Sequence, residues 1–136
     1  MIDRAIQTNS TLLICVDYGT TNYKELTYAK EHGLKTLVID HHHVGDHQVP
    51  ADVFVNPTWQ DNFPTTNLEA LACGTPVITY NTGGSPEAID QHTGMVVHKG
   101  DITGLRRSIE QIVNSNRESY RKACRERALN FYKKED

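Results

Sequence analysis

Five short apolar runs are spaced along the chain, and each one ends at polar or turn-forming residues. The runs cover residues 12–16, 36–39, 53–55, 77–80 and 95–97. Continuous runs of this length are typical of strands in a parallel sheet, where both faces of the sheet are covered. The run at 12–16 is the most strongly apolar, and we therefore expect a strand that is buried on both faces.

Helical segments are predicted between most of these runs. Residues 21–32 are polar with a few apolar positions, and Gly33 supplies the stop signal of a helix. A second helix is expected to begin at Thr66, because Thr66 and Glu69 fit a capping box, and to end at Gly74. Ser85 is expected to cap a short helix.

Two further helices are predicted near the C-terminus. Asp101 is placed to cap the first of them, in which the apolar residues recur on one helical face. The last helix has one apolar face and carries arginine and lysine elsewhere. The apolar positions are Leu105, Ile109, Ile112 and Val113 in the first, and Tyr120, Ala123, Cys124, Ala128 and Phe131 in the second.

The alternation of strands and helices predicts an α/β fold: a three-layer, Rossmann-like parallel sheet of about five strands with flanking helices. We expect one domain over residues 1–136. The strand orders 1-2-3-4-5 and 2-1-3-4-5 are both compatible with the sequence. The first order would leave one sheet face thinly covered, so a monomer or a weak homodimer is expected.

Composition narrows the functional classes. The chain has 136 residues, a net charge of −3 and 23% charged residues, which gives no electrostatic reason to expect binding to nucleic acid or to a membrane. The N-terminus is polar, and no apolar run is long enough to span a bilayer. Three separated cysteines form no disulfide framework, so a cytoplasmic protein is expected, with Cys15 and Cys73 as small core residues.

Polar residues follow several of the predicted strands. Asp17 and the segments 40–43, 56–63 and 81–84 all come directly after an apolar run. Ligands of parallel α/β sheets bind outside the carboxyl ends of the strands. Any functional site is therefore expected at this edge of the sheet.

The first half resembles the DHH phosphoesterase superfamily, most closely its RecJ-like exonuclease branch. The resemblance rests on Val-Asp-Tyr-Gly at 16–19, Asp-His-His at 40–42 and Val-Asn-Pro at 55–57. It implies that Asp17 bridges two metal ions, that His41 is a metal ligand and that His42 binds phosphate or metal. The family also needs an Asp-x-Asp motif, which this chain lacks. Retained phosphodiester hydrolysis is therefore not expected.

The same histidine-rich segment leaves two alternatives for metal binding. Asp17, His41, His42 and their neighbours either form a solvent-exposed histidine loop or bind Zn²⁺, Ni²⁺ or Cu²⁺ adventitiously, since imidazole suits these ions. We favour the exposed loop. No cofactor is expected beyond such an adventitious divalent metal.

The second half resembles the donor-binding domain of retaining glycosyltransferases of family four. The resemblance is carried by residues 61–78, by Gly-Gly-Ser-Pro-Glu at 83–87 and by residues 93–101. It implies a vestigial nucleotide-sugar site in which Asp61 faces the donor sugar and Glu69 binds the ribose hydroxyls. The diphosphate would lie at a helix N-terminus, which the loop with Phe63, Thr65 and Thr66 enters.

The two resemblances meet within residues 50–57, so the chain is interpreted as a phosphoesterase-like half, 1–50, joined to a glycosyltransferase-like half, 51–136. We therefore expect an engineered or recombined chimera without evolved catalytic activity and without known partners. One alternative is a module that binds nucleotide diphosphates or their sugars weakly. The other is a remnant of a metal-dependent phosphoesterase.

Overall fold

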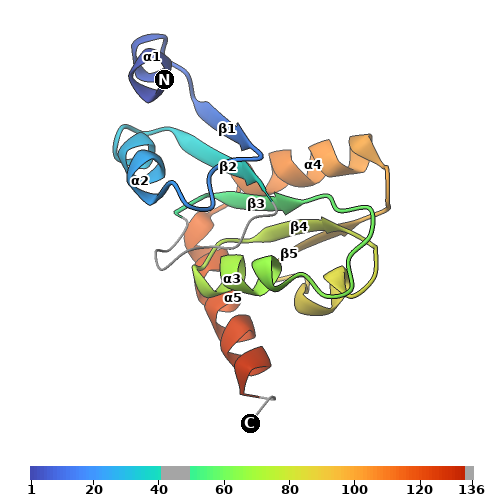
Figure 1. The fold of residues 1–136 in the computed structure, drawn as a ribbon. Helices are drawn as coiled ribbons and strands as arrows, with labels where there is room; N and C mark the ends of the chain where they lie inside the picture. Colours follow the sequence, from blue (N-terminus) through green and yellow to red (C-terminus); the bar gives the residue numbers. More distant parts are fainter. Residues whose placement is uncertain (41–49, 134–136) are drawn as a thin grey trace.

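The fold is a single parallel sheet of five strands with helices on both faces (Figure 1). The computed structural model describes residues 1–40 and 50–133. All four neighbouring strand pairs are parallel, and the order is β1-β2-β3-β4-β5. The strands are β1 (Leu12–Val16), β2 (Lys35–Ile39), β3 (Val53–Asn56), β4 (Val77–Tyr80) and β5 (Gly94–Val97). The structure thus confirms the α/β class and selects the first of the two expected strand orders.

The helices alternate with the strands after β1, except between β2 and β3 in the described residues. They are α1 (Ile2–Gln7), α2 (Tyr23–Glu31), α3 (Thr65–Ala72), the 3-10 helix η1 (Ser85–Ala88), α4 (Ile102–Val113) and α5 (Arg117–Tyr132). Asp101 caps α4 as predicted, because its carboxylate accepts a hydrogen bond of 2.9 Å from the Gly104 N–H. Two capping predictions are wrong. The N-cap of α3 is Pro64, two residues before the expected Thr66, and the N-cap of η1 is Gly84, one residue before the expected Ser85.

The two faces of the sheet are covered unequally. On one face α2, α3 and α5 enclose a core that includes Leu26, Val38, Phe54, Leu71 and Ala128. On the other face α4 packs against β3, β4 and β5, burying a second core. That second core contains Leu37, Val53, Val55, Ile78, Tyr80, Val97 and Ile112.

Strand β1 lies at the edge of the sheet and is not buried on both faces, which corrects the prediction for residues 12–16. Leu12, Ile14 and Val16 are 36%, 54% and 66% exposed. They share the sheet face of Leu37, and α4 alone does not reach across to them. The apolar run therefore forms a strand for the predicted reason, but no helix of residues 1–40 or 50–133 covers its outer face.

The N-terminal helix α1 was not predicted. None of its residues is buried, and Tyr28 of α2 donates a hydrogen bond of 2.9 Å to Asp3. Its apolar residues Ile2, Ala5 and Ile6 share one helical face, but the helix is only six residues long, too short for this spacing to stand out in the sequence.

The cysteines differ in environment. Cys15 and Cys73 are half-buried rather than core residues, whereas Cys124 is fully buried in α5 and donates a weak hydrogen bond of 3.7 Å to the Thr93 carbonyl oxygen. Burial, assisted by the charge of Asp90, raises the pKa of the Cys124 thiol to about 12. Since the thiolate is the reactive form, the folded protein keeps Cys124 inert.

At pH 8, iodoacetamide is therefore expected to modify Cys15 and Cys73 in the native protein and to leave Cys124 unmodified until the protein is unfolded in urea. Peptide mass spectrometry checks this. Because the folded pKa lies above the ordinary value of 9.0, the stabilisation by this thiol is complete below pH 9 and is lost as the pH rises towards 12. Modification of Cys124 at the rate of Cys73 in native protein would contradict the packing of α5.

Candidate functional site

The loop that follows β3 is held in place by a turn that follows β4. The Thr82 hydroxyl donates to the Thr58 carbonyl oxygen at 2.9 Å, and the Gly84 N–H donates to the Asn62 carbonyl oxygen at 2.8 Å. Gly83 has φ +50°, and a Cβ on it would lie 1.6 Å from the carbonyl oxygen of Asp61. The Gly83–Gly84 turn thus lets two backbone segments meet at the carboxyl edge of the sheet.

Helix α3 begins at this loop without a side-chain cap. Pro64 is the N-cap residue, with φ −75° and ψ 105°, and the Asn67 N–H donates to its carbonyl oxygen at 3.0 Å. Among the described residues, the N–H groups of Thr65 and Thr66 find no backbone acceptor. These donors and the helix dipole form an environment that favours an anion.

A buried pair of amides connects the end of β3 with α3. The Asn56 side chain donates a hydrogen bond of 2.9 Å to the Asn67 Oδ1 atom, and Asn67 is fully buried. The Asn67 Nδ2 atom has no acceptor within the part of the chain that the structure describes. No local sequence pattern indicates this pair, which joins the last residue of β3 to the third residue of α3.

The structure brings the five predicted nucleotide-sugar residues into one loop and the first two turns of α3. Asp61 and Glu69 are half-buried, Thr65 is exposed and Thr66 is buried. Thr65 and Glu69 lie four positions apart on α3 and so share a helix face. Phe63 differs from the rest, because its ring packs against Phe131 of α5, with 6.1 Å between the ring centroids.

The residues of the predicted metal site lie beyond the neighbouring strands. Asp17 and Asp40 line a cavity of about 290 Å³ with residues from the end of β3. Asp40 is buried and accepts hydrogen bonds from the Thr20 N–H and hydroxyl at 3.2 and 2.9 Å. His41 and His42 lie outside the described residues. Within residues 1–40 and 50–133, no group of three His, Cys, Asp or Glu side chains is close enough to hold a metal ion.

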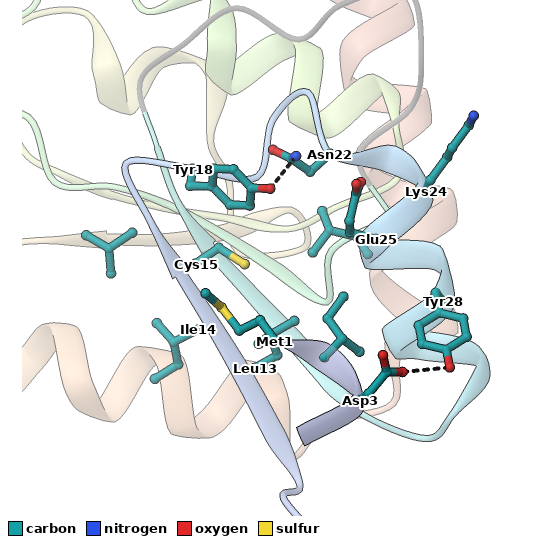
Figure 2. A pocket seen from close by; sticks show the side chains of 13 residues that line it. Met1, Asp3, Leu13, Ile14, Cys15, Tyr18, Asn22, Lys24, Glu25 and Tyr28 are labelled. Carbon is teal, nitrogen blue, oxygen red and sulfur yellow. Dashed lines mark hydrogen bonds between the residues drawn. The ribbon is translucent and has the colours of Figure 1, made fainter. Parts of the chain in front are cut away.

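A larger cavity, of about 690 Å³, lies on the other side of β1, between α1 and α2 (Figure 2). Its lining includes Leu13, Cys15 and Tyr18, whose hydroxyl accepts a hydrogen bond of 2.6 Å from Asn22. The burial of Cys15, with the charge of Asp40, raises the pKa of its thiol. None of the five predicted nucleotide-sugar residues lines this cavity, which therefore lies apart from that site.

A parallel sheet with flanking helices and with loops at its carboxyl edge is a Rossmann-like α/β architecture. The family model "Glycosyl transferases group 1" matches residues 2–131, and the chain belongs to this family.

Several known proteins are similar to parts of the chain. The capsular polysaccharide biosynthesis glycosyltransferase CapM of Staphylococcus aureus is 39% identical over 64 residues, which are 46% of this chain and 17% of CapM. The single-stranded-DNA-specific exonuclease RecJ of Haemophilus influenzae is 37% identical over 70 residues, 51% of this chain and 12% of RecJ. The chain thus spans less than a fifth of the length of either relative.

The fold is shared with solved structures. Sucrose-phosphate synthase from Thermosynechococcus elongatus superposes with a TM-score of 0.59 and 23% identity, over 95% of this chain and 36% of that chain. At this identity the likeness shows the fold alone, a glycosyltransferase-type arrangement of parallel strands and flanking helices.

These comparisons overturn the interpretation of the chain as an engineered chimera without evolved activity. The glycosyltransferase model matches residues 2–131, a range that includes the supposed junction at 50–57. RecJ is similar to about half of the chain, and this similarity does not confirm a chimeric origin. Of the expectations drawn from the sequence, the comparisons favour the glycosyltransferase-derived nucleotide-binding module.

The length and polarity of the described helices decide whether any of them could span a membrane. None of those in residues 1–40 and 50–133 is long and apolar enough to cross a bilayer.

Proposed function

We propose that this chain binds a nucleoside diphosphate sugar at the N-terminus of α3, as the donor-binding part of a glycosyltransferase. The observation that carries the proposal is the uncapped start of α3, which a loop held by the Gly83–Gly84 turn enters. Membership of the glycosyltransferase family and the names of the relatives, which are glycosyltransferases such as CapM, support the same class of ligand.

In this proposal the diphosphate binds to backbone N–H groups in the first turn of α3. The N–H groups of Thr65 and Thr66 are not used within the described backbone, and a phosphate oxygen can accept from both. The helix dipole adds a favourable interaction with negative charge over the same turn. In the part of the chain that the structure describes, no side chain caps this helix, because Pro64 takes the place of the expected capping residue.

The two carboxylates have distinct roles in the proposal. Glu69 lies one helical turn beyond Thr65 on the same face of α3, at the distance where a ribose would follow the diphosphate. Its carboxylate accepts hydrogen bonds from the ribose hydroxyls. Asp61 comes before the helix, on the other side of the diphosphate position, and its carboxylate faces the transferred sugar. Phe63 supports the loop by packing on Phe131 rather than contacting the ligand.

The neighbouring charges set a limit to the affinity. Asp17 and Asp40 occupy the ends of β1 and β2, beside the end of β3. Two carboxylates on the same edge of the sheet disfavour a diphosphate, and screening by salt reduces this effect. We therefore expect a dissociation constant on the order of 1 mM, corresponding to about 4 kcal/mol of binding free energy.

The substitution Glu69→Ala is expected to weaken the binding of a nucleoside diphosphate sugar by more than about tenfold, since a hydrogen bond to a charged group contributes about 1.5–3 kcal/mol. Isothermal titration calorimetry with uridine and guanosine diphosphate sugars measures the change. Glu110→Ala is the matched control, because Glu110 is an exposed glutamate on α4 that pairs with Arg106 at 3.2 Å. Equal affinity of the Glu69→Ala variant and the wild type would refute the ribose contact.

A second variant tests the diphosphate position separately. Thr65→Pro removes one backbone N–H at the first position of α3, where proline is well tolerated and no internal hydrogen bond is lost. The variant is expected to keep the thermal stability of the wild type and to bind the diphosphate more weakly, with no change for the nucleoside alone. Unchanged binding of the diphosphate would place it away from the α3 N-terminus.

A further inference from the structure

The loop after β3 also presents an aromatic side chain that the proposed nucleotide site does not use. Trp59 is the only tryptophan of the chain, and 65% of its surface is exposed. It lies on the carboxyl edge of the sheet, two residues before Asp61. This exposed aromatic side chain therefore lies at the edge where ligands of parallel α/β sheets bind.

The indole ring is held from two sides. The Tyr80 ring, at the end of β4, meets it nearly at a right angle, with 6.5 Å between the centroids and an interplanar angle of 81°. Lys99, which follows β5, places its Nζ atom 4.9 Å from the ring centroid. The ring is thus oriented by residues from the ends of two further strands, although most of it faces solvent. We name Trp59, Tyr80 and Lys99 the Trp59 platform.

The charge of Lys99 has no counter-ion among the described residues. Its contact with the indole is a cation–π interaction, and no described carboxylate forms an ion pair with it. An ammonium group over an exposed indole offers two complementary interactions to one ligand. The indole face suits the apolar C–H face of a sugar ring, and the ammonium suits a carboxylate or phosphate on that sugar.

We propose that the Trp59 platform binds a sugar that carries an anionic group, either a uronate or a sugar phosphate, beside the nucleotide-sugar site. The sugar ring stacks on the open part of the indole, and its anionic group pairs with Lys99. This site shares the loop after β3 with the proposed donor site, but it uses none of the five residues assigned to that site.

Because Trp59 is the only tryptophan, its fluorescence reports on this site directly. Titration with glucuronate and with glucose 6-phosphate is expected to give a saturable change in emission, with a dissociation constant on the order of 1 mM. Methyl glucoside is expected to bind about tenfold more weakly, since it lacks the charge-assisted contact. Comparing the two anionic sugars shows whether the site binds a carboxylate, a phosphate or both. The proposal would be overturned if inorganic phosphate changed the emission as much as the anionic sugars do. It would also be overturned if none of the sugars changed the emission.

Three variants assign the effect to its residues. Lys99→Gln is expected to abolish the tenfold preference for anionic sugars, whereas Lys24→Gln, an exposed lysine on α2, keeps it. Trp59→Ala is expected to lose sugar binding in saturation-transfer NMR, and Trp59→Phe to retain part of it. Glu69→Ala is expected to leave the titration unchanged, so failure of the nucleotide proposal and failure of this one give different results. An unaltered preference in Lys99→Gln would overturn the role of the ammonium group.

Discussion

Replacing Gly83 with alanine is expected to lower the free energy of unfolding by about 3 kcal/mol or more, and to abolish nucleotide-sugar binding. The residue has φ +50°, a conformation that costs an alanine about 1–2 kcal/mol. The new Cβ would also lie 1.6 Å from the Asp61 carbonyl oxygen and 2.9 Å from its carbonyl carbon. Both of these are backbone atoms, so the clash is relieved only if the loop of residues 57–64 moves.

The control for this substitution is Gly33→Ala at the end of α2. Gly33 has φ +81°, yet a Cβ there would meet no atom within 4 Å. It therefore carries the backbone strain without the clash, and we expect a loss of about 1 kcal/mol. Urea unfolding followed by circular dichroism compares the two variants. If Gly83→Ala were as stable as Gly33→Ala, the Gly83–Gly84 turn would not be what holds the loop of residues 57–64 in place.

The positions of the strands could be predicted because each one is a short apolar run that ends at polar or turn-forming residues. The run at 53–55 became β3 (Val53–Asn56), and the run at 77–80 became β4 with the same bounds. The environment of a strand is a different matter. Residues 12–16 have the composition of a buried strand, but their exposure follows from the strand order and from how far α4 extends across the sheet. Neither of these can be predicted from the local sequence.

The candidate site was predictable to a similar extent. The acidic residues Asp61 and Glu69 and the glycine pair at 83–84 belong to one motif, and their order along the chain already places them at one edge of a parallel sheet. The start of α3 was wrong by one residue because Thr66 and Glu69 imitate a capping box, whereas Thr66 is buried and the helix begins after Pro64. The Asn56–Asn67 pair and the Trp59 platform depend on tertiary contacts, which no local pattern records.

The chimera interpretation failed for a related reason. Short motifs such as Asp-His-His at 40–42 are recognisable without their context, and they suggest an origin for the segment that holds them. A family model weighs the whole chain, and it matches from residue 2 to residue 131. In physical terms, β1 and β2 continue the same parallel sheet as β3 to β5, with Leu37, Val53 and Val55 in one core.

The second large effect is expected at the centre of that sheet. Phe54 lies on β3, the middle strand, with only 1% of its surface exposed, and it packs in the core that α2, α3 and α5 enclose. Phe54→Ala is expected to reduce the free energy of unfolding by about 3–5 kcal/mol, because the lost apolar burial is joined by the cost of the cavity. Phe54→Leu keeps most of the volume and is expected to cost less than about 1.5 kcal/mol.

Leu129→Ala is the control for this core substitution. Leu129 lies on α5 and is 57% exposed, so its truncation is expected to change the free energy of unfolding by less than about 0.5 kcal/mol. Urea midpoints at constant m-value measure all three variants. A loss below about 1 kcal/mol for Phe54→Ala would mean that the helices do not close over β3 as described. Because β3 leads directly into Asn56 and the loop that enters α3, the core around Phe54 is also what fixes the position of the proposed donor site.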